Sequence, residues 1–363
     1  MVRVDLSGYG YVNARVRGMR AHLLKKDFFM RLVEVEDFEA LHSLLEQTAY
    51  RREVNEEVLI KPENPDFDQA FNLNLIACLL KIHDSTGGEP RKLVSLLFSR
   101  YDVENVKAIL RGKKGGASPG EILNATIPVG NIKMDKLEEL ARQREIPDVL
   151  KVMAALRIKY ARPLAQAMPE YHSHENDLAI LELALDKFHF ADSMESLTGK
   201  DDNVKMVRQM FTSEIDMRNI STLVRTRGIR LDDEEVLELR IPGGSLAPVQ
   251  FLEIHNMGDI AQMVSEYPDP RVRKVLERAL AEYQELDVVA FDRELERELT
   301  REAVGMSNLD VLGIGVIIGF IWAKQNEIIN LRIVVKGKSM DQPQAKIRDN
   351  LFFVEREDGE GPQ

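Results

Sequence analysis

The chain has 363 residues, of which 44% are hydrophobic, so it can bury the cores of two or three ordinary domains. Its 60 acidic and 49 basic residues give a formal net charge of −11. That balance argues against nucleic acid as a partner and against broad attraction to an anionic membrane surface. Cys78 is the sole cysteine, which excludes an intramolecular disulfide framework and fits a reducing cytoplasm.

No segment is apolar for long enough to cross a bilayer. The amino terminus has no apolar run of signal-peptide length. The longest apolar run, Val311–Ala323, covers thirteen residues and contains three glycines, whereas a transmembrane helix needs about 20. We therefore expect a buried helix there, no direct membrane span, and any membrane association to run through a partner.

The amino-terminal segment combines a basic cluster with a helical pattern. Arg15, Arg17 and Arg20 lie close together in sequence and form a candidate partner contact. A helix is expected to begin at Phe28–Phe29, and its pattern is similar to that of a second segment that starts near Phe251.

One polar pattern, acidic-x-x-Asn-x5-basic-x-basic, occurs three times. Its copies are Asp102, Asn105, Arg111 and Lys113; Asp216, Asn219, Arg225 and Arg227; and Glu327, Asn330, Lys336 and Lys338. The asparagines are 219 − 105 = 114 and 330 − 219 = 111 positions apart. Solenoid repeats are about 20–50 residues long, so a unit of this length is a small domain. Three copies predict a pseudo-threefold internal repeat, arranged as a ring, cone or funnel that holds another molecule.

Apolar residues recur in steps of three and four on both sides of each asparagine, which predicts a helix with one buried stripe. In the first copy these residues are Leu93, Leu96, Leu97, Val106, Ile109 and Leu110. The basic pair follows, with Gly112, Gly228 and Gly337 close by. Cations in the last turn and a glycine beyond it are helix-stop signals. Each copy thus predicts a buried helix with a polar asparagine and a basic end.

Similar segments flank each copy. Helical patterns precede the asparagines at Phe67–His83, Glu175–Phe190 and Val288–Ala303, and each contains an acidic residue 37 or 38 positions before the asparagine: Asp68, Glu182 and Asp292. Ile127-Pro128 and Ile241-Pro242 begin 22 positions after the first two asparagines, and glycines follow. The third copy ends before such a continuation, which the amino-terminal segment is a candidate to supply.

We predict an all-α fold of three similar helical domains, roughly residues 1–121, 122–236 and 237–363. The only strand signals are at Val58–Lys61 and Leu237–Ile241. The tail from Glu355 to Gln363 is acidic and glycine-bearing, and we expect it to be disordered.

The repeated polar residues have two interpretations each. Asn105, Asn219 and Asn330 are either buried amides that bind the backbone of a neighbouring segment or direct partner contacts. The basic pairs either bind a partner or complement helix dipoles and internal carboxylates. His172 and His174 form a His-x-His pair, but no second cluster supports a metal site. No phosphate loop, nucleophile elbow or Cys-x-x-Cys is present, so we expect no enzyme.

Several motifs together carry a family resemblance. They are Tyr11–Arg17, Asp216–Ile220, Leu223–Arg225, Ile241–Gly244, and Gly319–Lys324 running on through Glu327 and Asn330–Arg332 to Ile347–Asp349. They resemble the C subunits of archaeal A-type ATP synthases, the counterparts of the d subunits of V-type proton pumps. The likeness covers nearly the whole chain, with Phe320 as a mild departure where the family pattern has tyrosine.

The resemblance implies a funnel of three helical domains without an active site, cofactor or metal. In such complexes the protein sits peripherally at the cytoplasmic face of the cell membrane, as part of the central rotor. It links the central stalk, made by the D and F subunits, to the membrane proteolipid ring, whose repeated protein is called K or c. It transmits the torque that couples ATP synthesis or hydrolysis to transport of hydrogen or other ions. The alternative is a helical scaffold that joins soluble partners without a membrane ring.

Overall fold

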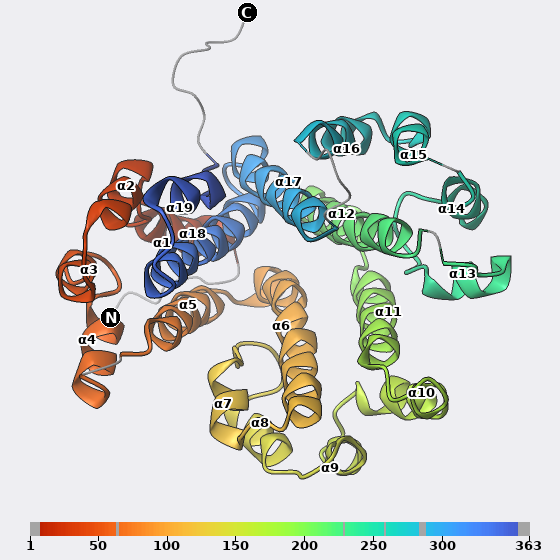
Figure 1. Ribbon diagram of the computed structural model, residues 1–363, viewed down its shortest axis with the longest axis horizontal. Coiled ribbons are helices and arrows are strands. Elements are labelled where there is room, and N and C mark those ends of the chain that lie inside the picture. Colours follow the sequence, from red (N-terminus) through yellow and green to blue (C-terminus); the bar gives the residue numbers. More distant parts are fainter. Residues whose placement is uncertain (1–7, 63–64, 228, 258, 283–287, 355–363) are drawn as a thin grey trace, which may run out of the picture. The chain divides into compact units, whose positions relative to one another are not determined.

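The described part of the protein is built from helices (Figure 1). The computed structural model describes residues 8–62, 65–227, 229–257, 259–282 and 288–354. These residues form nineteen helices and no strand, so the predicted all-α class is confirmed. The acidic tail, Glu355–Gln363, and Gly228 lie outside the described residues.

The helices follow one another through short connections. The first group comprises α1 (Tyr9–Arg20), α2 (Lys26–Glu34), α3 (Phe38–Leu45), α4 (Arg51–Ile60), α5 (Phe67–Asp84) and α6 (Gly88–Gly115). The second comprises α7 (Pro119–Asn124), α8 (Met134–Ala141), α9 (Ile146–Ala155), α10 (Ala161–Ser173), α11 (Leu178–Ser196) and α12 (Asp202–Arg225). The third comprises α13 (Asp233–Leu239), α14 (Pro248–His255), α15 (Ile260–Glu266), α16 (Pro270–Glu282), α17 (Val288–Leu309), α18 (Gly315–Ser339) and α19 (Gln344–Asn350). The predicted helical segments before each asparagine correspond to α5, α11 and α17.

Both expected strands are wrong. Val58–Ile60 forms the last turn of α4, and Leu237–Leu239 the last turn of α13. Short apolar runs do not distinguish strand from helix, and a local cap decides in favour of helix at α13. There the Asp232 side chain accepts hydrogen bonds from the first-turn N–H groups, while the Glu235 side chain accepts one from the backbone N–H of Asp232.

The chain divides into two compact units, the first of which combines Met1–Val94 with Thr300–Gln363. The centre of this unit is α18, whose apolar first half is buried on all sides. Helices α1, α2, α5 and α19 all pack against α18. Gly319 permits close packing with the turn around Ser307, because a Cβ there would lie 2.8 Å from the Ser307 Cβ.

The second unit, Ser95–Leu299, contains two separate hydrophobic cores. The first core gathers buried side chains between Val103 and Leu185, and the second gathers those between Met217 and Leu295. Each core therefore begins in the second half of a long helix that carries a repeat asparagine, α6 or α12. The three predicted domain boundaries and the funnel arrangement stay predictions.

The two described glycines at the basic pairs do not end the long helices, contrary to the expectation. Gly112 lies inside α6 and Gly337 inside α18. A Cβ on Gly112 would overlap with the Ile122 side chain of α7, and a Cβ on Gly337 would lie 2.6 Å from the Ile347 Cγ1 of α19. Each glycine thus admits the isoleucine ten positions later. The second copy has a larger residue, Thr226, and a smaller partner, Val236, at these positions.

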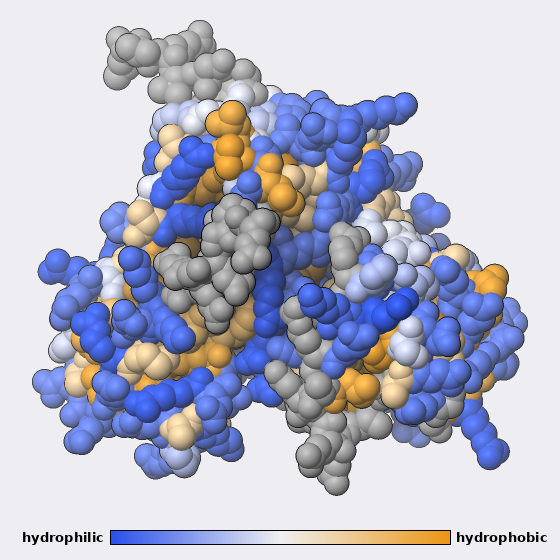
Figure 2. Space-filling model, turned by 90° about the horizontal axis from the view of Figure 1, so that it is seen from above, coloured by the Kyte–Doolittle hydropathy of each residue, from blue (hydrophilic) through white to orange (hydrophobic). Residues whose placement is uncertain are grey.

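The surface seen in Figure 2 is mainly hydrophilic, with apolar residues in separate patches. Among the described helices, none is both long enough and apolar enough to cross a bilayer. The apolar run Val311–Ala323 is divided between an exposed connection and the buried start of α18.

Candidate functional site: the repeated helix ends

Each repeat asparagine binds both backbone polar groups of one residue 22 positions later. The Asn105 amide donates to the Ile127 carbonyl at 2.8 Å, and its oxygen accepts from the Ile127 N–H at 2.7 Å. Asn219 makes the same pair with Ile241 at 2.9 and 2.8 Å. Asn330 makes it with Phe352 at 2.7 and 3.0 Å. We call each pair an asparagine bridge; it suits asparagine because one amide carries both a donor and an acceptor.

The three amides are almost completely buried, with the Asn105, Asn219 and Asn330 residues 2%, 0% and 1% exposed. Buried backbone groups that lack a partner are costly. Each bridge satisfies two such groups just after the short helix, α7, α13 or α19, that follows the long helix, and so attaches that segment to the long helix.

The acidic residue of the motif binds the next part of the same connection. Asp102 accepts hydrogen bonds from the N–H groups of Asn131 at 2.9 Å and Ile132 at 2.8 Å. Asp216 accepts one from Ser245 N–H at 2.7 Å. A Cβ at Gly130 or Gly244 would overlap with these carboxylates, which explains the glycines after Ile-Pro. Burial raises the pKa of Asp102 despite its backbone hydrogen bonds, which act in the opposite direction.

In the third copy the amino-terminal segment takes this role. Glu327 accepts a hydrogen bond from the N–H of Leu24. Leu24 lies two positions before the start of α2, as Ile132 does before α8, while Ser245 of the second copy lies three positions before α14. The segment from the other end of the chain therefore continues the third copy, in the register of the first.

Glu327 also belongs to a buried cluster that sequence reasoning missed. Its carboxylate lies 2.7 Å from the Lys324 ammonium and accepts a hydrogen bond from the Tyr50 hydroxyl at 2.7 Å. The Lys324 ammonium lies 4.0 Å from the centre of the Tyr50 ring. Burial, and then the negative charge of Glu327, raise the pKa of Tyr50 well above its usual value. Sequence analysis could have found this cluster, because the charged residues Lys324 and Glu327 interrupt the apolar pattern of this helix.

The first basic residue of the motif forms an ion pair in two copies. Arg111 of α6 makes two 2.6 Å hydrogen bonds to Glu182 of α11, and Arg225 of α12 pairs with Asp292 of α17. Both carboxylates occupy the acidic position noted before each asparagine. The third such carboxylate, Asp68, lies 3.4 Å from Arg332 of α18.

The second basic residue caps another helix in two copies. The Lys113 ammonium donates to the carbonyl of Ala141, the last residue of α8. The Lys338 ammonium donates to Val33 and Val35 at the end of α2. Lysine at a helix carboxyl end satisfies free carbonyls and complements the dipole. Burial lowers the pKa of both lysines. Arg227, their counterpart, is half-buried just after α12.

The remaining predicted contact residues differ in how they are engaged. Arg17 donates to the Val311 carbonyl, and Arg20 donates to the Ser307 hydroxyl at 2.7 Å. Arg15 is exposed and donates to the Tyr11 hydroxyl of the same helix at 3.1 Å. Lys336 is exposed, and within the described residues its ammonium has no ion pair. Most of the predicted basic contacts thus bind other parts of the chain.

The second unit contains a charged network that the motif did not reveal. Lys107 of α6 lies 2.7 Å from Asp186 of α11, and Arg218 of α12 lies 3.0 Å from the same carboxylate. Beside it, His189 is buried, and neither ring nitrogen has a hydrogen-bond partner among the described residues. Burial, and then the positive charge of Arg218, lower the pKa of His189 to about 3.

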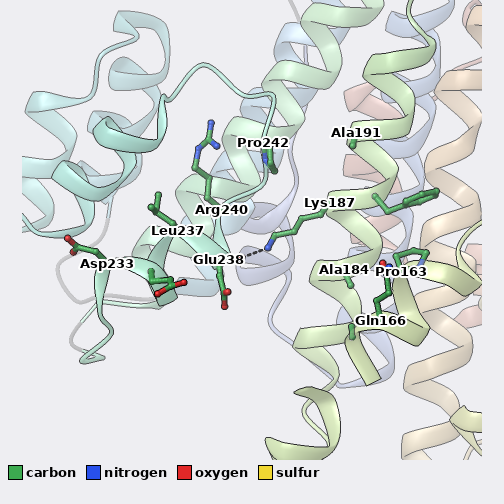
Figure 3. Close-up of a pocket in the computed structure, with 13 residues that line it drawn as sticks. Pro163, Gln166, Ala184, Lys187, Ala191, Asp233, Leu237, Glu238, Arg240 and Pro242 are labelled. Atoms are coloured by element: carbon green, nitrogen blue, oxygen red, sulfur yellow. Dashed lines mark hydrogen bonds between the residues drawn. The ribbon is translucent and has the colours of Figure 1, made fainter. Parts of the chain in front are cut away.

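An open groove lies between α13 and the helices α10 and α11 (Figure 3). Pro163, Ala184 and Phe188 line one side, and α13 contributes acidic residues. The Lys187 ammonium crosses to α13, where it donates to the Glu238 carbonyl. The groove contains no nucleophile beside a base. Within the described residues no group of His, Cys, Asp and Glu is placed to hold a metal, and His172 and His174 make only local hydrogen bonds.

Comparison with known proteins finds similarity along almost the whole length of the chain. The model of the ATP synthase (C/AC39) subunit family matches residues 12–350. The C subunit of the A-type ATP synthase of Methanocaldococcus jannaschii is 27% identical over 353 residues, which cover 97% of this chain and 88% of that protein. The C subunit of Methanosarcina acetivorans is 29% identical, covering 96% and 94%, and that of Pyrococcus abyssi is 23% identical, covering 90% and 86%. The chain therefore belongs to the ATP synthase (C/AC39) subunit family.

Proposed function

We propose that this chain is the non-catalytic central-rotor adapter of an A/V-type ATP synthase. It links the central stalk of the D and F subunits to the membrane proteolipid ring and transmits torque between them. It acts at the cytoplasmic face of the membrane as a peripheral protein, without a cofactor. The observation that carries the proposal is the family match over residues 12–350, together with relatives that are named as subunits of A-type ATP synthases.

The internal contacts support a role in transmitting force. A torque adapter must not deform when it is twisted, and close-packed helical cores have low compressibility. In this chain the three asparagine bridges attach the segments after α7, α13 and α19 to the long helices. The ion pairs of Arg111 and Arg225 join successive long helices within the second unit. Removing these contacts should soften the adapter without removing a reacting group.

The contacts also rank the nine candidate partner-binding residues. Lys113 and Lys338 donate to backbone carbonyls at helix ends, so their replacement would disturb the fold. Arg15 and Lys336 are exposed and carry fewer internal contacts. We therefore expect substitutions at Arg15 and Lys336 to report on partner binding most directly, because charge-assisted contacts across an interface depend on accessible side chains.

The test is binding of the purified chain to two partners separately: a co-expressed D–F shaft and a detergent-solubilised ring. We expect the folded chain to bind both, and to lack ATP hydrolysis on its own. Binding to neither partner by a folded chain would contradict the adapter and leave the helical scaffold for soluble proteins. Hydrolysis of ATP by the isolated chain would contradict the non-catalytic assignment.

A further inference from the structure

The groove of Figure 3 lies between helices of the two hydrophobic cores of the second unit. One wall is formed by α10 and α11, which contribute Leu164 and Leu185 to the first core. The other wall is formed by α13, which contributes Val236 to the second core. The groove has a volume of about 940 Å³, whereas protein interiors are close-packed and resist compression. Movement between the two cores is therefore easier than movement within either core.

The two cores are joined closely at one place, the hairpin of α11 and α12. Among the described helices of the second unit, no other pair with one member from α6–α11 and one from α12–α17 makes extensive backbone contact. Phe190 of α11 and Phe211 of α12 meet edge to face there, with ring centres 6.3 Å apart. The connection between the two helices, residues 197–201, includes Gly199 with a φ of +116°, which glycine adopts without steric cost. Hinges are usually a few residues at the ends of such elements, so this connection has the form of a hinge.

Polar contacts between long side chains supply the rest of the joint. The Arg218 guanidinium of α12 lies 3.0 Å from the Asp186 carboxylate of α11 and 3.5 Å from that of Glu104 on α6. The Arg100 guanidinium of α6 lies 3.6 Å from the Glu214 carboxylate of α12. An arginine side chain has many rotamers and can follow a carboxylate through a small displacement, whereas interdigitated apolar side chains cannot. The joint is therefore held by contacts that tolerate motion.

One side chain crosses the groove, that of Lys187 on α11. Its ammonium donates a hydrogen bond to the carbonyl of Glu238, the penultimate residue of α13. All residues that line the groove are described, and no other side chain among them is hydrogen-bonded to the opposite wall. Burial lowers the pKa of Lys187, so its positive charge is held there at a cost. A single hydrogen bond at an open groove has a modest net value, because water can replace either partner. The contact can therefore bias the joint and still be released.

We propose that residues 197–201 are a hinge between the two cores of the second unit, and that Lys187 is the strap that holds this hinge in its described position. Release of the Lys187 hydrogen bond lets the second core turn away from α10 and α11, which widens the groove. Stiffness then belongs to each core, and the flexibility of a twisted adapter belongs to the joint between them. The hinge is a property of the chain alone, so its test needs neither the D–F shaft nor the ring.

Distances between paired nitroxide labels test the hinge directly. Cys78 is the sole cysteine, so a C78S background accepts two new labelled cysteines. The pair K151C/V249C spans the joint, because Lys151 lies on α9 of the first core and Val249 on α14 of the second, and both residues are exposed. The pair K151C/A165C lies within the first core, because Ala165 is an exposed residue of α10. Pulsed electron paramagnetic resonance measures the distance distribution of each pair in the folded chain.

The variant K187M removes the strap. We expect the K151C/V249C distribution to become about twofold wider and to shift to longer distances, because hinge rotation moves the two cores as rigid bodies. The K151C/A165C distribution and the urea midpoint of unfolding should stay close to those of the wild type. K187R keeps a donor at this position and should restore the wild-type distribution.

The matched control variant is K159M. Lys159 also contacts α11, through an ion pair with Asp192 at 2.5 Å. Its neighbours Ile158 and Tyr160 belong to the first core, so this contact does not cross the groove. K159M removes the same charge and should leave both distance distributions unchanged. Equal widening by K159M and K187M would contradict a specific role of Lys187 as the strap.

Three further results would overturn the hinge. An unchanged K151C/V249C distribution in K187M would show that Lys187 does not restrain the joint. Widening of both label pairs would show that the first core itself loosens. Faster amide hydrogen exchange in α13 alone, with unchanged K151C/V249C distances, would show that Lys187 holds one short helix rather than a core.

Discussion

Lys324 and Glu327 form an ion pair within one turn of α18, 2.7 Å apart and with each side chain only 3% exposed. A buried ion pair is costly to break, because the remaining charge has no water to solvate it, yet an apolar replacement of both partners is often tolerated. We expect Lys324→Met to cost about 3–5 kcal/mol in unfolding free energy. Adding Glu327→Leu should recover a substantial part, as measured by urea unfolding. A double variant less stable than the single would show that the Leu24 and Tyr50 contacts of Glu327 outweigh the unpaired charge.

Asn219→Leu should destabilise the second unit. The substitution leaves the N–H and carbonyl of Ile241 buried without their partner, which predicts a loss of about 2–4 kcal/mol for two groups. Asn308→Leu on the exposed side of α17 is a control expected to change stability by at most about 0.5 kcal/mol. Chemical denaturation of both variants measures the difference; equal stability would mean that water replaces the asparagine bridge.

Gly112→Ala sets two effects against each other. Alanine favours a helix interior by about 1 kcal/mol over glycine, but its methyl group would overlap with Ile122. We expect the cost of the overlap to exceed the gain in helix propensity and to lower stability by about 1–3 kcal/mol. Ile122→Val in the same chain should restore part of the loss, because it removes the Cδ1 atom at 2.8 Å but keeps a γ carbon; Thr226 and Val236 form the corresponding pair in the second copy. A rise in Tm for Gly112→Ala alone would show that α7 shifts freely.

Charge reversal at Arg225 separates internal pairing from partner binding. Arg225→Glu places a carboxylate beside Asp292, and because Arg225 is 60% exposed the expected cost is about 0.2–1 kcal/mol. Asp292→Arg should recover it. Binding of the swapped pair to the D–F shaft and to the ring then reports on position 225 itself. Normal binding by the swapped pair indicates an internal role, and weak binding by a stable swapped pair indicates a partner contact. The double reversal Arg225→Glu/Arg227→Glu extends the test to both basic residues.

His189 should make folding stability depend on pH. Its pKa is about 3 in the folded chain and about 6.5 when unfolded. Between pH 3 and pH 6.5 the unfolded chain binds one more proton at His189 than the folded chain does. The contribution of His189 to the free energy of unfolding is therefore complete above pH 6.5 and is lost as the pH falls toward 3. His189→Phe should reduce the slope of unfolding free energy between pH 7 and 4, measured by urea titration at each pH. An unaltered slope would locate the pH dependence in other groups.

Local pattern was sufficient to predict much of the fold. The three- and four-residue steps around Asn105 and its counterparts predict the long helices, because one face of each must be buried. The failures at Val58–Lys61 and Leu237–Ile241 came from runs too short to show a period. The glycine at position 112 was misread because its role depends on Ile122, a residue of another helix.

Contacts between distant segments were beyond the reach of local pattern. The acidic positions Asp68, Glu182 and Asp292 were visible as a recurrence, but their arginine partners depend on which helices pack together. The pairing of Lys324 with Tyr50 could not be read from sequence for the same reason. The basic residues looked accessible because sequence does not show where the carbonyls of Ala141 and Val33 lie.

The hydrogen bond from Leu24 to Glu327 has a consequence for biosynthesis. The two residues are 303 positions apart, so the first unit cannot close until almost the whole chain has left the ribosome. The second unit, Ser95–Leu299, is continuous in sequence and can fold while translation continues. The amino-terminal helices, although made first, must wait with their apolar faces unpaired until α18 emerges. Contacts of such long sequence separation also form slowly. Before α18 emerges, the exposed apolar faces of the amino-terminal helices are therefore the surface on which chaperones would act.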